Sequence, residues 1–155
     1  MPGIFATMRP AIVLSLAALL LASCAAPEPT KVRLAGASPS SGPYSPGVDL
    51  GDLVFLAGQI GVEPSTRQLV PGGIEAETHQ VMANLGALLA EAGLGYGDVV
   101  KTSVFLADVT DFDTMNRIYR SYFPSDAILP ARTTVQVAAI PRGARVEIDF
   151  IAARR

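Results

Sequence analysis

The C-terminal stretch from Pro130 to Ala152 alternates between apolar and polar residues, and this alternation constrains the fold more than any other feature. In its second half, Val146, Ile148 and Phe150 occupy every other position, with charged residues between them. A period of two is typical of a half-buried β-strand. The first half alternates in the same way, and residues 141–143 (Pro-Arg-Gly) have turn chemistry. We therefore predict two strands joined as a hairpin.

The predicted hairpin determines which side chains share a face. Arg132, Thr134 and Gln136 would lie opposite the apolar face that contains Val135. Pairing across the turn would place Gln136 close to Glu147. An arginine and a glutamate would then share one face of the sheet, which is either solvated or part of a site.

The rest of the chain predicts strands and helices in alternation. Short apolar runs predict buried strands at Leu53–Gly58 and Asp98–Ala107. Apolar residues at helical spacing predict a helix from Ile74 that ends at Gly93, and a second helix with Thr110 as its N-cap that ends at Pro124. This order indicates an α+β domain with two helices on one face of the sheet. The uncovered face predicts a homo-oligomer.

The chain begins with a short apolar segment. Residues 11–21, which follow Arg9 closely, are apolar apart from Ser15. This run is too short for a bilayer-spanning helix of about 20 residues but suits a signal peptide. The run ends in Leu21-Ala22-Ser23-Cys24, which resembles the lipobox of bacterial lipoproteins, whose cysteine becomes the lipid-modified N-terminus. The alternatives are an ordinary signal peptide with an incidental cysteine, or a retained membrane anchor.

These features predict three segments. Residues 1–23 would be a lipoprotein signal peptide, residues 24–36 the lipidated Cys24 with a tether, and residues 37–155 one globular domain. The lipid would attach the protein to the cell envelope on the periplasmic side. Ala25 after the cysteine favours the outer membrane where the organism has one.

Composition argues against two classes of partner. The net charge is −2 and no basic cluster precedes the terminal Arg154-Arg155 pair, so a nucleic acid bound through its phosphates is not expected. The chain has one histidine and one cysteine, which argues against a metal site built from those ligands.

Several short motifs occur in order from about Ala37 to Ala152. They are Ser41–Ser45, Ala57–Gly61, Asn84–Leu85, Gly97–Thr102, Asp111–Phe112 with Asn116–Tyr119, Pro130–Thr133 and Val146–Asp149. In this order they resemble the Rid/YjgF family, the reactive-intermediate (enamine/imine) deaminases. The resemblance implies a chorismate-mutase-like α+β fold, a homotrimer with clefts between subunits, and hydrolysis of 2-imino or 2-enamino acids to 2-oxo acids and ammonia without a cofactor.

The resemblance also assigns catalytic roles to three residues. Arg132 would bind the substrate carboxylate, because a guanidinium matches a carboxylate with two parallel hydrogen bonds. Glu147 would orient and deprotonate water, and in its acid form would protonate the leaving nitrogen. Tyr44 would donate a hydrogen bond from the neighbouring subunit to the substrate or to an ordered water. The structural alternatives are a surface ion pair for Arg132, a solvated strand charge for Glu147 and loop packing for Tyr44.

Gly58, Asn116 and Thr134 complete the predicted substrate site. Asn116 is explained about as well by helix capping or by a hydrogen bond between helices. Thr134 stands where the family often has cysteine, although its backbone N–H can still contact a carboxylate. Ala57 stands where many members have a serine, so one hydroxyl near the imine is missing.

Two functions remain open on the sequence. The first is deamination of imino or enamino acids. The second is a non-catalytic module of the same fold that binds a small carboxylate at the envelope, which Ala57 favours. A ribonuclease, proposed for some relatives, suits this acidic chain poorly.

Overall fold

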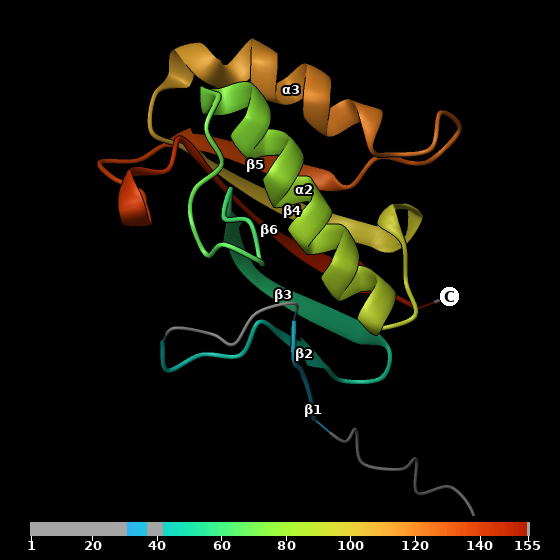
Figure 1. Cartoon of the computed structure of the whole chain (residues 1–155). Coiled ribbons are helices and arrows are strands. Elements are labelled where there is room, and N and C mark those ends of the chain that lie inside the picture. The colour runs from blue at the N-terminus through green and yellow to red at the C-terminus, as the bar shows by residue number, and fades with distance from the viewer. Residues whose placement is uncertain (1–30, 37–41, 155) are drawn as a thin grey trace, which may run out of the picture.

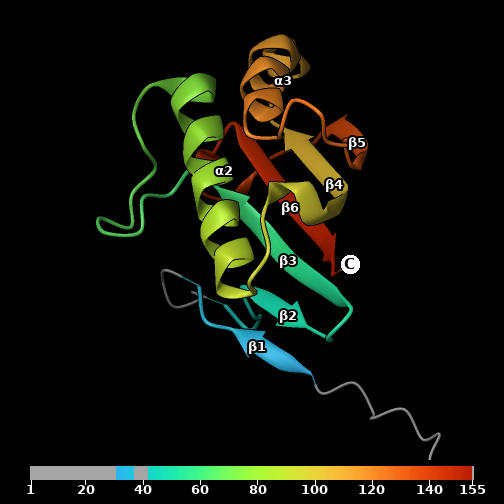
Figure 2. The same ribbon diagram turned by 90° about the vertical axis from the view of Figure 1, so that its right-hand side faces the viewer.

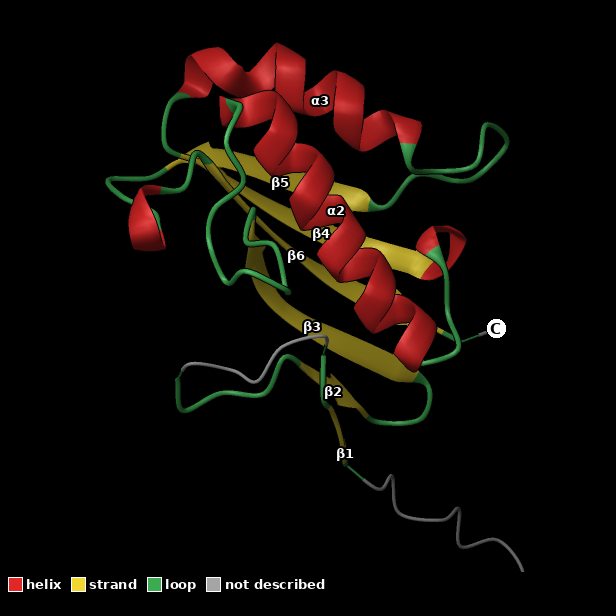
Figure 3. Ribbon diagram, in the orientation of Figure 1, coloured by secondary structure: helices red, strands yellow, loops and turns green. Residues whose placement is uncertain are grey.

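A six-stranded sheet with two α-helices on one face forms the body of the molecule (Figures 1 and 2). The computed structural model describes residues 31–36 and 42–154. The strands are β1 Val32–Leu34, β2 Gly47–Asp49, β3 Leu53–Ile60, β4 Val99–Leu106, β5 Ala131–Gln136 and β6 Val146–Ala153. The α-helices are α2 Gly73–Glu91 and α3 Phe112–Ser121, and short 3₁₀ turns occupy Tyr96–Asp98, Val109–Asp111 and Pro141–Gly143 (Figure 3). This confirms the predicted α+β class with both helices on one face.

The core lies between the helices and the sheet. Buried residues of α2 pack against alternate residues of β3, β4 and β6; among them are Val81, Met82, Leu85, Leu89, Val54, Val104, Ile148 and Phe150. The helix ends as predicted, because Gly93 adopts a φ of +72° and its N–H donates to the carbonyl of Ala90. That left-handed conformation favours glycine.

The predicted hairpin is wrong, although both of its strands exist. The sheet order is β1-β2-β3-β6-β4-β5, so β4 lies between β5 and β6. Phe105 of β4 pairs with Val135 on one side and with Glu147 on the other. The chain returns from β4 through α3 to β5, and this crossover makes β5 parallel to β4. Periodicity predicts a strand but does not say which strand lies beside it.

The same register corrects the predicted faces of the sheet. Arg132 is paired with Thr102, which is paired with Phe150 on its other side, so these three residues lie on the face covered by the helices. Glu147 and Val135 lie on the opposite face, and Val135 is 43% exposed. The prediction that Arg132 and Glu147 share a face is therefore wrong for a single protomer.

The start of α3 also differs from the prediction. The helix begins at Phe112 after the Val109–Asp111 turn, so Thr110 is not its N-cap. Instead, Asp108 accepts hydrogen bonds from both the backbone N–H and the hydroxyl of Thr110. An aspartate that precedes a turn commonly makes this local contact with the backbone.

The ordered sheet extends further toward the N-terminus than expected. β1 falls within the stretch predicted as a tether and pairs with β2 at one edge of the sheet. The Glu91 carboxylate holds the next residues by accepting hydrogen bonds from the N–H groups of Ala35 and Gly36, at 2.7 and 3.0 Å. Cys24 and the predicted signal peptide lie outside the described residues. Within residues 31–36 and 42–154, no helix combines the length and apolarity that crossing a bilayer requires.

Apolar side chains remain partly exposed on the face that the helices do not cover. Leu53 and Phe55 are each 40% exposed, and Val135 lies on the same face at the other end of the sheet. An apolar surface on one side of a sheet commonly marks a protein–protein interface.

Candidate functional site

Arg132 lies on the edge strand β5 beneath α3. Its Nη2 donates a hydrogen bond of 2.6 Å to Oδ1 of Asn116. Its guanidinium carbon lies 4.8 Å from the centre of the Tyr119 ring and 5.7 Å from that of Phe112. Phe112, Asn116 and Tyr119 are spaced four and three residues apart on α3, so they form one stripe facing Arg132.

A cavity of about 290 Å³ opens beside this arginine. It is lined by Asn116, Tyr119, Arg120, Leu129, Pro130 and Arg132. Arg120 already donates hydrogen bonds to the carbonyls of Phe123 and Ser125, so its guanidinium stabilises the segment that follows the C-terminus of α3. The structure therefore brings the predicted Arg132 and Asn116 together at one cavity large enough for a small acid. Thr134 follows on the same face of β5, two residues further along.

Glu147 lies on the open face of β6, directly over Gly58. A Cβ at position 58 would collide with the Glu147 carboxylate, so glycine is required for this close approach. Burial raises the pKa of Glu147, and the neighbouring Asp149 raises the same pKa further. A carboxyl group with a raised pKa exchanges protons more readily near neutral pH. The structure thus brings the predicted Gly58 and Glu147 together, on the face of the sheet opposite Arg132.

Tyr44 is remote from Arg132 within one protomer. It lies in the loop before β2 and is 52% exposed. Three strands, β3, β6 and β4, separate β2 from the edge strand that carries Arg132. A single protomer therefore does not bring Tyr44 to the arginine.

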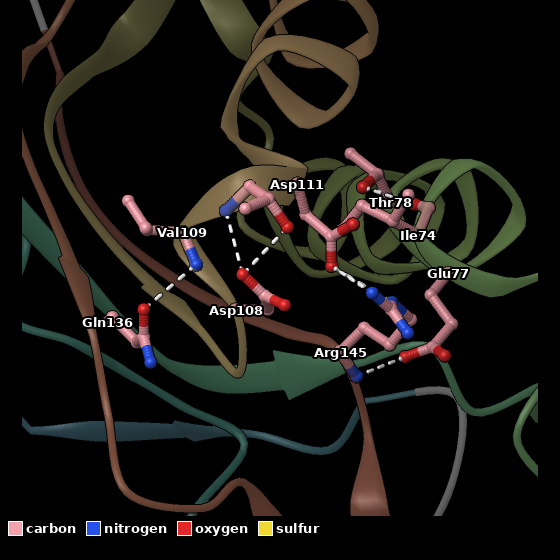
Figure 4. Close-up of polar contacts among 9 residues, drawn as sticks. Ile74, Glu77, Thr78, Asp108, Val109, Asp111, Gln136 and Arg145 are labelled. Carbon is pink, nitrogen blue, oxygen red and sulfur yellow. Dashed lines mark hydrogen bonds and ion pairs between the residues drawn. The ribbon is translucent and has the colours of Figure 1, made fainter.

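A partly buried polar network fixes the start of β6 (Figure 4). The backbone N–H of Arg145 donates to the Glu77 carboxylate at 2.8 Å, and its guanidinium forms a 2.7 Å ion pair with Asp111. Glu77 and Asp111 are only 6% and 9% exposed, whereas the Arg145 side chain is 44% exposed. Because Arg145 is two residues before Glu147, this network links α2 and the turn before α3 to the strand that carries Glu147.

Sequence reasoning missed Tyr119 and Leu129 as parts of the cavity. In the sequence Tyr119 stands out only as the last residue of the Asn116–Tyr119 motif, although its spacing from Asn116 is a usable signal. Leu129 lies in the loop between α3 and β5, whose sequence has no helical or strand periodicity. Among residues 31–36 and 42–154, no group of three or more His, Cys, Asp or Glu side chains is arranged to hold a metal ion.

Comparison with known proteins agrees with this architecture. The family model described as endoribonuclease L-PSP matches residues 35–154. A 2-iminobutanoate/2-iminopropanoate deaminase of Mus musculus is 51% identical over 111 residues, which is 72% of this chain and 81% of the relative. The deaminase of the same name from Escherichia coli (strain K12) is 44% identical over 115 residues, covering 74% and 89% of the two chains.

Solved structures give the same result. The YjgF gene product from E. coli superposes with a TM-score of 0.75 at 41% identity, covering 81% of this chain and 99% of that one. E. coli TdcF, solved with bound serine, has a TM-score of 0.75 at 38% identity over the same shares. With the fold and these relatives in agreement, the chain belongs to the endoribonuclease L-PSP family, that is, the Rid/YjgF family.

Proposed function

We propose that this protein is a cofactor-independent hydrolase that deaminates reactive 2-imino and 2-enamino acids to 2-oxo acids and ammonia. The observation that carries the proposal is Arg132, held by Asn116 at the wall of a cavity of about 290 Å³. The chain is 44–51% identical to proteins named 2-iminobutanoate/2-iminopropanoate deaminase, which supports the same reaction class.

The chemistry needs a carboxylate clamp and a group that handles protons. Arg132 binds the substrate carboxylate through the donors that Asn116 leaves available, which fixes the adjacent imine carbon. Water adds to that carbon while Glu147 takes one proton from the water and delivers it to the nitrogen, which gives a carbinolamine. Glu147 then takes the second proton, from the carbinolamine hydroxyl, and delivers it to the nitrogen as the C–N bond breaks and the C=O bond forms. The products are a 2-oxo acid and ammonia, so water is the only other reactant. The raised pKa of Glu147 suits both steps.

This mechanism requires more than one protomer. Arg132 and Glu147 lie on opposite faces of one sheet, so a cleft that contains both must take them from different subunits. The partly exposed Leu53, Phe55 and Val135 offer an apolar surface for such an assembly. The Rid/YjgF family resemblance implies a homotrimer, in which Tyr44 would also reach the cleft from a neighbouring subunit.

A coupled assay tests the activity. An amino-acid oxidase generates a 2-imino acid in the presence of semicarbazide, and the protein competes by hydrolysing the imine before the semicarbazone forms. We expect the wild type to reduce semicarbazone formation and Arg132→Ala to lose the effect. Arg117→Ala is the matched control, because Arg117 is an exposed arginine of α3. A wild type that leaves semicarbazone formation at the buffer rate contradicts deamination and favours the non-catalytic binding module.

We further propose that Cys24 carries a lipid that attaches the domain to the cell envelope on its periplasmic side. The support is the apolar run at residues 11–21 and the lipobox-like sequence that ends at Cys24. Expression with a labelled fatty acid, followed by membrane fractionation, tests this. We expect label and membrane association with the wild type and neither with Cys24→Ser. Equal fractionation of both proteins would contradict the anchor.

A further inference from the structure

Tyr119 and its surroundings form a continuous set of contacts behind Arg132. The Tyr119 side chain lies between β4 and α3 and is only 3% exposed. Its hydroxyl is 2.9 Å from the Oγ1 of Thr102, a residue with no exposed surface. Thr102 is also the residue directly paired with Arg132 across the parallel strands. The phenol is therefore fixed at its far end by the strand that neighbours β5.

The ring of Tyr119 also contacts the guanidinium of Arg132. The guanidinium carbon of Arg132 lies 4.8 Å from the ring centre, within the range in which a cation is attracted to an aromatic face. Burial raises the pKa of Tyr119, so the phenol stays neutral beside the arginine. Asn116 accepts a hydrogen bond from Nη2 of Arg132, which fixes one edge of the planar guanidinium.

We propose that Tyr119 is a positioning residue for the carboxylate clamp: its ring is the platform on which the Arg132 guanidinium rests, and Thr102 fixes the ring through its hydroxyl. A free arginine side chain samples many rotamers, and ordering it on substrate binding weakens affinity. A guanidinium held by a ring and by Asn116 is ordered before the substrate arrives. Its remaining donors then face the cavity.

This inference rests on the proposed carboxylate-binding role of Arg132 but does not require turnover. Its test is therefore a binding measurement with 2-oxobutanoate as the probe, made by titration calorimetry on the full domain. Loss of the ring in Tyr119→Leu should weaken binding by roughly 3- to 30-fold, as expected for one cation–π contact in a partly desolvated site. Tyr119→Phe keeps the ring and should recover most of that loss.

Phe123→Leu is the matched control for simple loss of core packing. Phe123 is 5% exposed and stacks 4.7 Å from Tyr119, but it does not line the cavity. We expect it to lower the melting temperature while the dissociation constant stays near that of the wild type. In the imine assay, Tyr119→Leu should raise KM and leave kcat within about twofold, since the platform acts before the chemical step.

Three outcomes overturn the inference. The first is equal weakening by Phe123→Leu and Tyr119→Leu, which would mean that Tyr119 is only a core residue. The second is a wild type that does not bind 2-oxobutanoate, and the third is a Tyr119→Leu variant that binds it as tightly as the wild type. A wild type that binds the probe but hydrolyses no imine contradicts the proposed deaminase activity alone, because the comparison of dissociation constants still decides the role of Tyr119.

Discussion

Subunit mixing gives the most direct test of where the two halves of the site meet. Arg132 and Glu147 lie on opposite faces of the sheet in one protomer, so each cleft should combine the arginine of one subunit with the glutamate of the next. Arg132→Ala and Glu147→Ala should each be inactive alone. When the two variants assemble together, some clefts should regain both side chains.

The fraction of activity that the mixture recovers follows from how often one cleft receives both intact side chains. With equal amounts of the two variants and random assembly, half of the subunits supply an intact Arg132 and half supply an intact Glu147. A cleft between two independent subunits is then complete in about one case in four, so the unselected mixture as a whole should regain about 25% of the wild-type activity in any cyclic oligomer. The value does not depend on the number of subunits in the ring.

The assay is co-expression of the two variants with different tags, followed by purification through both tags and measurement of imine hydrolysis. Selection for both tags enriches mixed assemblies, so recovery should exceed that of the unselected mixture. The control is Arg132→Ala with Asn116→Ala, because both residues line the same cavity of one protomer and no cleft would become complete. Mixed Arg132→Ala and Glu147→Ala assemblies that remain inactive would refute a site shared between subunits.

Three further outcomes are expected. Asp149→Asn should shift the acidic limb of the pH–rate profile to lower pH: Asp149 helps raise the pKa of Glu147, and the base form of Glu147 is lost as pH falls through that pKa. Gly58→Ala should reduce kcat by about 100-fold with the far-ultraviolet circular dichroism unchanged, because its Cβ displaces the Glu147 carboxylate. Glu77→Ala should lower the free energy of unfolding in urea by about 1–3 kcal/mol, because the partly buried N–H of Arg145 loses its acceptor.

Each of these expectations has a result that contradicts it. An acidic limb unmoved by Asp149→Asn would assign that limb to a group other than Glu147. A Gly58→Ala protein with wild-type kcat would mean that the carboxylate acts from another position. The control for Glu77→Ala is Glu75→Ala, because the Glu75 side chain is 62% exposed. Equal free energies of unfolding for these two variants would contradict a structural role for the network around Arg145.

Much of the secondary structure could be predicted from local patterns. Alternation places strands close to their observed bounds at β5 and β6, and the helical spacing from Ile74 to Gly93 nearly matches α2. The pairing of these strands could not be predicted in the same way. Alternation describes each strand alone, whereas the position of β4 between β5 and β6 depends on contacts between distant parts of the chain.

The candidate site was predictable to a similar extent. Arg132 and Asn116 were both expected at the site, and the structure places them in contact at one cavity. Their spatial relation to Glu147 could not be inferred, because it depends on which strands are neighbours. The part played by Tyr119 follows only from the way α3 packs across β5, which no local spacing determines.

The sheet order has a consequence for how the chain is made. β3 and β4 do not pair with each other; both pair with β6, which follows them in the sequence. β3 can pair with β2, and β4 with β5, before β6 has been synthesised, but the two parts of the sheet cannot join until then. The edges of β3 and β4 that face β6 stay unpaired in the interval, and such unpaired strand edges are prone to aggregation. Completion of the sheet therefore waits for β6, and the chain depends on protection of these two edges until that strand is made.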